Sequence, residues 1–165
     1  VTNVPGAPVV LQQGELLELL VAGTLAHPGD FFIDADKPIA VANYVRGGYA
    51  LTESVGDPAM VQLSPVEQFL PRYVVLVPEE WADGYLVVTR ETGAEVLLDG
   101  VAIPDENFVA VNPEYEAARE LVDVGVHQLD SDTGFSVVVV GFGNQDSLAY
   151  LGGSGTGRIN PIPEG

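Results

Sequence analysis

The stretch Phe135-Ser-Val-Val-Val-Val-Gly-Phe142 decides the fold class of this chain. Its four consecutive valines form far too short a run to cross a bilayer, which takes about 20 apolar residues. A short apolar run rich in β-branched side chains is typical of a strand in a packed sheet, because these side chains fit a pleated surface well. The stretch therefore predicts a β-strand.

Similar short runs lie on both sides of this strand and are separated by glycine, proline and aspartate. They occupy residues 9–12, 16–21, 31–34, 39–45, 60–63, 73–77, 85–90, 95–98, 108–111, 127–129 and 147–151. Many strands spaced about 8–12 residues apart favour a sandwich or barrel over alternating β–α units. We expect an all-β fold, an antiparallel β-sandwich with Greek-key connections and little or no helix.

Two segments also fit a helix. Residues 14–21 carry apolar side chains at helical spacing, but the run is short. Residues 112–121 begin with Asn112 and Pro113, which suit a helix N-cap and first helical position. Against this, Tyr115 and Arg119 lie on one face of a two-residue alternation, as in a strand with one wet face. We predict strands for both segments.

The chain is long enough for one domain. It has 165 residues, of which 47% are hydrophobic, so it can bury a core. We expect a single all-β domain over residues 1–153, followed by a Gly/Pro-rich tail or linker over residues 154–165. Val1 is not an initiator methionine, so both ends are expected to be cut ends of a longer protein.

Composition excludes several classes of function. The 24 acidic and 6 basic residues give a formal charge of −18, which repels phosphate backbones and anionic lipids. We therefore expect neither nucleic-acid binding nor membrane insertion. The absence of cysteine excludes disulfides, thiolate catalysis and cysteine-ligated zinc, and only His27 and His127 are available for a histidine-built site.

Three blocks of sequence, in this order, resemble one family. They are Ile33–Tyr44; Gly56–Phe69 leading to Tyr73–Pro78; and Gly125–Leu129 followed by Phe135–Gly143 and Ser147–Gly153. Together they resemble the IgGFc-binding protein N-terminal domain family of mucus-type glycoproteins and bacterial surface or secreted proteins. The most specific element is Gly56-Asp-Pro58, with Met60 two residues on and Pro65-x-x-Gln68 after it. The resemblance spans about residues 11–153.

The resemblance also implies that the chain is incomplete. Domains of this family are usually about twice as long, and these blocks resemble the second half. The family tends to end in a Tyr/Gly-rich block, whereas Phe142 and Leu148-Ala-Tyr-Leu151 replace part of that aromatic set here. The resemblance implies an extracellular or cell-surface location. It does not by itself imply antibody binding, which is an activity of one kind of member.

One segment begins like a calcium loop. Asp130-Ser-Asp132 places two carboxylates one residue apart, ahead of Gly134. Calcium takes about 6–8 oxygen ligands, and an EF-hand loop adds a third acidic position and a distal glutamate that are lacking here. We therefore predict a solvated hairpin turn between the strands at 127–129 and 135–142, and no metal site.

Carboxylate pairs are the other candidates for chemistry. Asp34-Ala-Asp36 and Asp105-Glu-Asn107 could form a cation site if the fold brought them together, and two carboxylates two residues apart would also suit the acid pair of a polysaccharide hydrolase. Among 24 acids such pairs arise by chance. Serines 64, 131, 136 and 147 lie in no nucleophile elbow, His127 is expected in a strand and His27 in a loop. We predict no catalytic, cofactor-binding or metal-binding residues.

Two further motifs have structural interpretations. Asp57-Pro58 resembles the start of a self-cleaving Gly-Asp-Pro-His motif, but Ala59 stands where the histidine would be, so an uncleaved turn is expected. Lys37, the only lysine, could form an isopeptide crosslink with an asparagine. An exposed lysine in a turn is the preferred interpretation.

These observations predict a non-catalytic extracellular structural or adhesive module of a larger secreted or surface protein. Its partners would be proteins or glycans at a cell surface or matrix, or neighbouring domains. The first alternative is a glycan-binding module that uses exposed aromatic side chains, namely Trp81, Tyr44, Tyr49 and Tyr85. The second is a subunit of an extracellular filament or lattice, joined through long edge strands. A carboxylate-based hydrolase ranks third.

Overall fold

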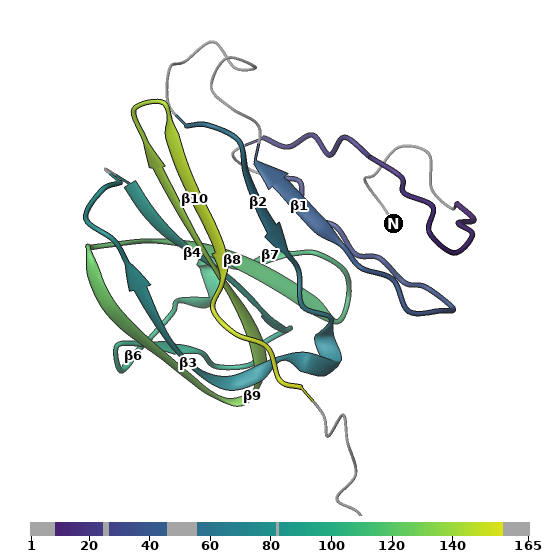
Figure 1. Cartoon of the computed structure of the whole chain (residues 1–165). Helices are drawn as coiled ribbons and strands as arrows, with labels where there is room; N and C mark the ends of the chain where they lie inside the picture. The colour runs from purple at the N-terminus through teal and green to yellow at the C-terminus, as the bar shows by residue number, and fades with distance from the viewer. Residues whose placement is uncertain (1–8, 25–26, 46–55, 82, 157–165) are drawn as a thin grey trace, which may run out of the picture.

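The computed structural model describes residues 9–24, 27–45, 56–81 and 83–156 of the chain. These residues form two antiparallel sheets and two 3-10 turns, at Val66–Gln68 and Asp105–Asn107 (Figure 1). The strands are β1 (Ala42–Val45), β2 (Ala59–Gln62), β3 (Leu70–Val77), β4 (Asp83–Glu91), β5 (Leu97–Leu98), β6 (Val101–Ala102), β7 (Val109–Ala110), β8 (Tyr115–Val122), β9 (Gly125–Gly143) and β10 (Asp146–Leu151).

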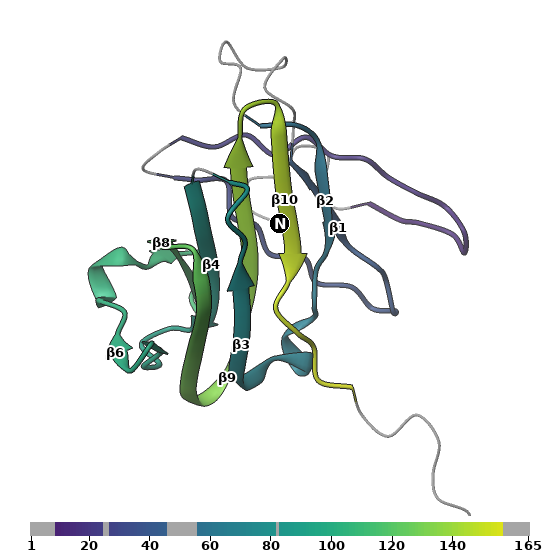
Figure 2. The same ribbon diagram turned by 60° about the vertical axis from the view of Figure 1, so that its left-hand side comes forward.

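The 19-residue strand β9 organises the large sheet. Its first part pairs with β3 and β5, and its second part pairs with β4 and β10. The full order is β6-β5-β9-β4-β8-β7, with β3 and β10 as further partners of β9. Figure 2 shows β9 bending at its lower end, so that the sheet curls into a half-barrel. The second sheet contains only β1 and β2 and lies alongside β10.

The core lies in the concavity of the curled sheet. Side chains alternate between core and surface along β3 and β4, as the two-residue period of a strand requires. The core-facing set includes Tyr73, Val75 and Val77 of β3, Leu86 and Val88 of β4, Ala118 of β8, and Leu129, Phe135, Val137 and Val139 of β9. Tyr73 and Phe135 pack edge to face, with ring centroids 4.9 Å apart.

The predicted fold class is confirmed at the level of an antiparallel, nearly helix-free β protein. The described strands form one curled sheet and a two-stranded sheet. The Greek-key sandwich stays a prediction, as does a domain boundary at Gly153. Within the described ranges, no helix is both long and apolar enough to cross a membrane.

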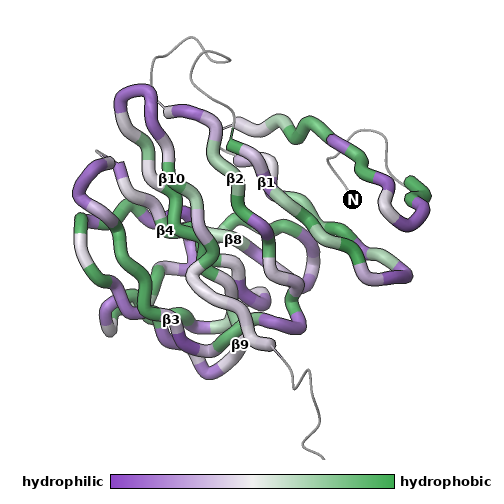
Figure 3. Tube along the Cα trace, viewed as in Figure 1, coloured by the Kyte–Doolittle hydropathy of each residue, from purple (hydrophilic) through white to green (hydrophobic). Residues whose placement is uncertain are grey.

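Three predicted strands are wrong. Residues 9–12, 16–21 and 31–34 belong to neither sheet, and residues 14–21 do not form the alternative helix either. Val10 and Leu16 are 85% and 88% exposed. An apolar run forms a stable strand only where another strand edge accepts its hydrogen bonds, and these runs lie outside both sheets. Figure 3 shows their apolar stretches along the N-terminal segment.

The predicted strand after Asn112 is confirmed as β8, which begins at Tyr115. The Asn112 side chain accepts hydrogen bonds from the backbone N–H groups of Glu114 and Tyr115, at 2.9 and 2.7 Å. A side chain suited to cap a helix therefore forms a turn that leads into a strand, because Asn stabilises either geometry.

The predicted turn at residues 130–134 is wrong. These residues continue β9 between its two halves. Leu70 of β3 pairs with Phe135, while Arg72, only two residues further along β3, pairs with Asp130. Residues 131–134 therefore form a bulge in the ladder. Bulges bend strands, which accounts for the change of partners along β9.

Candidate functional site

Gly56 and Asp57 fasten the start of β2 to the β9–β10 hairpin. The N–H of Gly56 donates to the carbonyl of Gly143 at 2.9 Å, and the N–H of Asp57 donates to Ser147 Oγ at 2.9 Å. Gly56 has a φ of +85°, and a Cβ there would lie 3.0 Å from Ser147 Oγ. Glycine at this first position of the most specific sequence block is therefore explained by the structure, since it adopts a positive φ without the steric cost that a Cβ would add.

The other end of the same block fastens the chain after β10. The carbonyl of Gln68 accepts from the N–H of Gly155 at 2.8 Å. The Ser154 hydroxyl donates to Gln68 Oε1 at 2.7 Å and also lies 2.8 Å from Ser64 Oγ. The block thus holds β2 beside β10 from both ends.

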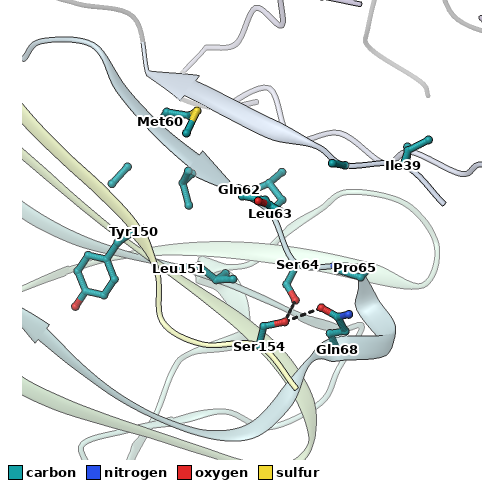
Figure 4. A pocket seen from close by; sticks show the side chains of 13 residues that line it. Ile39, Met60, Gln62, Leu63, Ser64, Pro65, Gln68, Tyr150, Leu151 and Ser154 are labelled. Atoms are coloured by element: carbon teal, nitrogen blue, oxygen red, sulfur yellow. Dashed lines mark hydrogen bonds between the residues drawn. The ribbon is translucent and has the colours of Figure 1, made fainter. Parts of the chain in front are cut away.

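A groove of about 530 Å³ lies between these two fastenings (Figure 4). Its walls come from β2, from β10 and from the segments that flank them. Its lining residues are Ile39, Ala40, Met60, Val61, Gln62, Leu63, Ser64, Pro65, Gln68, Ala149, Tyr150, Leu151 and Ser154. Each of the two strands has a ladder partner on one side only among the described residues, so their other edges border the groove.

The groove is lined by apolar and uncharged polar side chains. The residues that line it include no carboxylate, lysine, arginine or histidine. A serine nucleophile needs a nearby general base, whereas Ser64 and Ser154 are hydrogen-bonded to each other and to an amide. Apolar side chains and a few fixed polar groups are typical of a recognition surface for an uncharged group.

The calcium candidate is engaged in protein contacts. Asp130 accepts from Arg72 Nε through Oδ1 and from Gln128 Nε2 through Oδ2, the latter at 2.6 Å. These donors hold the pKa of Asp130 below its usual range, with the Gln128 bond as the largest cause. Within the described ranges, no group of three or more acidic or histidine side chains could hold a metal ion.

The carboxylate pairs are not assembled into a common site. Asp34 and Asp36 lie exposed in the segment before β1. Asp105 instead accepts a hydrogen bond from Arg90, and Asn107 Nδ2 donates to Glu120 at 3.0 Å. Asp105 and Asn107 lie on one 3-10 turn, and these two bonds attach the turn to strands β4 and β8.

His127 lies in a strand, as predicted, and its ring joins two turns. Nδ1 lies 2.7 Å from Asp99 Oδ2 and Nε2 lies 2.8 Å from the carbonyl of Asp123. Burial, the largest single influence, acts to lower the His127 pKa, but the two acceptors together outweigh it and raise that pKa. Asp99 accepts from the N–H of Gln128 and from His127, and its pKa is lowered. His27 lies in an exposed turn, also as predicted.

The three described aromatic residues of the glycan alternative lie in different surroundings. Trp81 packs against β9: a Cβ on Gly141 would lie 2.9 Å from Trp81 Cγ. Its Nε1 is buried and has no hydrogen-bond partner among the described residues. Tyr85 packs edge to face on Phe142, at 6.3 Å between centroids. Tyr44 on β1 is 65% exposed, and Tyr49 lies outside the described residues.

The remaining candidates, Lys37, Ser131 and Ser136, lie in an exposed bend or within strand β9. Lys37 lies in an exposed bend, as the turn interpretation predicts. Ser136 is buried in β9, and the hydroxyl oxygens of Ser131 and Thr133 lie 3.5 Å apart.

Sequence reasoning missed Arg90, which has the largest fully buried side chain among the described residues. It is 1% exposed and contacts Glu116, Asp105 and Phe108. Its place on the core face of β4 was the available signal.

The family model described as IgGFc binding protein matches residues 1–141, which include both the Gly56–Gln68 block and most of β9. No curated protein and no solved structure matches the chain. Since the match covers well over half of its residues, the chain belongs to the IgGFc binding protein family.

Proposed function

We propose that this chain is a non-catalytic, extracellular structural and adhesive module that binds a protein partner within a larger secreted or surface protein. The observation that carries the proposal is membership of the IgGFc binding protein family over residues 1–141. An uncharged groove without an acid–base pair and a surface with many exposed aliphatic side chains support binding over chemistry.

Direct binding tests this function. The chain would be immobilised and exposed to the Fc fragment of IgG, with the Fab fragment as a matched control. The resemblance alone does not imply antibody binding, but the family model that matches residues 1–141 is named for IgG Fc, so Fc is the protein partner we propose to test first, and we expect saturable binding of Fc and none of Fab. Absence of binding to Fc, together with saturable binding on a glycan array, would contradict the proposal and favour the glycan alternative.

The filament alternative has its own readout. Sedimentation velocity across a concentration series would reveal growing assemblies if edge strands join subunits end to end. The charge of −18 on each copy opposes such assembly at low salt. We therefore expect a concentration-independent sedimentation coefficient.

A further inference from the structure

The outer face of the β3–β9 ladder carries four exposed aliphatic side chains. Val74 and Leu76 of β3 are 61% and 53% exposed, and Val126 of β9 is 68% exposed. Val124, just before β9, is 49% exposed. We call these four residues the aliphatic face. Their neighbours Tyr73, Val75 and Val77 point the other way, into the core, so each strand presents one apolar side to the core and a second to solvent.

The register brings the members of this face together. Leu76 pairs directly with Val126, and Val74 is one pleat away on the same side of β3. The backbone N–H and carbonyl of Leu76 are both bonded to the Tyr150 hydroxyl, at 2.9 and 2.6 Å. Leu76 and Val126 are therefore a non-hydrogen-bonded pair, in which side chains lie closer together.

The same tyrosine makes strand addition unfavourable here. A chain that added to the free edge of β3 would need the backbone groups of Leu76, which Tyr150 occupies from the side of β10. A partner is thus offered the side chains of this face rather than the backbone of its edge.

One end of the aliphatic face is acidic. Glu79 and Glu80 follow β3 after Pro78 and are exposed, and Asp123 precedes Val124 in the segment that leads to β9. Val77 pairs with Gly125, so these three carboxylates flank the same end of the ladder. We call them the acidic end. At the opposite end Arg72 is paired with Asp130, and the ring of His127, whose side chain is 12% exposed, faces Asp99, so among the described residues both basic groups of this ladder are already matched by an anion.

We propose that the aliphatic face and its acidic end form a docking surface for a folded protein partner that presents apolar side chains at its centre and lysine or arginine at one margin. Charge complementarity fixes this chemistry: basic groups would meet Glu79, Glu80 and Asp123, while apolar groups cover Leu76 and Val126. A second copy of the chain would bring another formal charge of −18 and another acidic end. Because these charges repel, a second copy does not fit this surface. The proposal rests on the proposed function and names its contact surface.

Selection from an unbiased display library of a small binding scaffold tests the location. Independent binders to a protein tend to converge on the surface where a few side chains supply most of the binding energy. Each clone would be measured against the chain, against Leu76→Asp and against Met60→Asp. The last tests the groove as the competing surface, because Met60 is 54% exposed and lies in the groove, while Leu76 is 53% exposed.

We expect most clones to lose at least tenfold in affinity on Leu76→Asp and to keep affinity on Met60→Asp. Their loops should be enriched in arginine or lysine, and binding should weaken on Glu79→Gln/Glu80→Gln and as NaCl rises from about 0.05 to about 0.5 M. Thermal unfolding of each variant, within about two degrees of the wild type, shows that loss of binding is local.

Other results overturn the proposal in distinguishable ways. Clones that depend on Met60 or are spread over the surface place docking elsewhere and leave the proposed function standing. Clones whose binding changes neither with salt nor with Glu79→Gln/Glu80→Gln would contradict the proposal that the partner carries basic groups at one margin. Self-association that Leu76→Asp abolishes makes a second copy the occupant. Failure of the Fc measurement, in contrast, bears on the proposed function alone.

Discussion

The guanidinium carbon of Arg90 lies 3.4 Å from the centre of the Phe108 ring. Arg90 Nε also donates to Glu116 Oε1 at 2.8 Å, and Nη2 donates to Asp105 Oδ1 at 2.7 Å. One buried cation therefore joins β4, β8 and the 3-10 turn at Asp105–Asn107. The excursion through β5, β6 and β7 contributes Val96, Ile103 and Phe108 to the core, and the Arg90 side chain adds a polar attachment to the sheet.

Replacement of Arg90 by methionine should destabilise the fold strongly. It leaves the Glu116 carboxylate, which is only 14% exposed, without its cation, and the loss of one member of a buried pair costs about 3–5 kcal/mol. Urea unfolding followed by the fluorescence of Trp81, the only tryptophan, measures the loss.

The double variant Arg90→Met/Glu116→Leu should recover part of that stability, because it removes the orphaned charge as well. Arg72→Ala is the surface control, since that side chain is 71% exposed, and its unfolding midpoint should hardly move. A single Arg90→Met variant as stable as the wild type would contradict the assignment.

His127 should make stability fall as pH rises. Its two ring nitrogens face a carboxylate and a carbonyl, so both must carry hydrogen, and the imidazolium form is favoured. Because its folded pKa is raised above 6.5, the contribution is complete below about pH 6.5 and is lost as pH rises through the folded value. Urea unfolding at several pH values and constant ionic strength, for wild type and His127→Gln, gives the difference.

Asp99 sets the pH dependence of stability at acidic pH. Its folded pKa lies below 3.8, so its contribution is present above that value and lost as pH falls through the lowered one. Asp99→Asn should therefore remove most of the pH dependence assigned to His127. If the free energy of unfolding depends on pH in the same way for wild type and His127→Gln between about pH 5 and about pH 9, the His127–Asp99 interaction does not stabilise the fold as proposed.

Gly141→Ala should destabilise the chain by about 1–3 kcal/mol. A methyl group there would lie 2.9 Å from Trp81 Cγ and 3.1 Å from Trp81 Cβ, so the indole must move. Gly143→Ala is the matched control two residues along β9, where the nearest Trp81 atom is 3.6 Å away. Equal losses of stability for the two variants would argue against the Trp81 contact. The same packing means that Trp81→Ala tests folding as much as ligand binding.

The sequence indicated the parts of the fold that depend on local chemistry. The valines of β9, the alternation in β3 and β4 and the Asn112 turn all express preferences of neighbouring residues. The bulge at residues 131–134 could not be recognised, because Asp-Ser-Asp-Thr-Gly has the composition of a turn and only pairing with Leu70 and Arg72 makes it part of a strand.

Long-range contacts explain the other differences. The groove depends on hydrogen bonds between residues 90 positions apart, such as Ser64 with Ser154. The Gly56–Gln68 block could be recognised from the sequence, but the sequence does not show which distant residues it contacts. The runs at 9–12, 16–21 and 31–34 have strand composition, but a ladder also needs a partner edge, which composition does not specify.

Stability should increase with salt, and this prediction combines the charge count with the ion pairs. The formal charge is −18, and Arg72, Arg90 and Arg119 are each already paired with aspartate or glutamate. The remaining carboxylates repel one another across the surface and oppose the compact state. Salt shortens the Debye length from ~30 Å at 0.01 M to ~3 Å at 1 M, so it should weaken this repulsion.

Salt also screens the exposed pairs of Arg72 and Arg119, but such pairs stabilise little, and Arg90 is buried. The net effect should therefore be a midpoint of thermal unfolding that rises with NaCl well past about 0.15 M. Melting from about 0.01 to about 2 M NaCl measures it, with KCl to separate screening from specific sodium binding. A flat or falling curve would show that the carboxylates are too widely spread for their repulsion to matter.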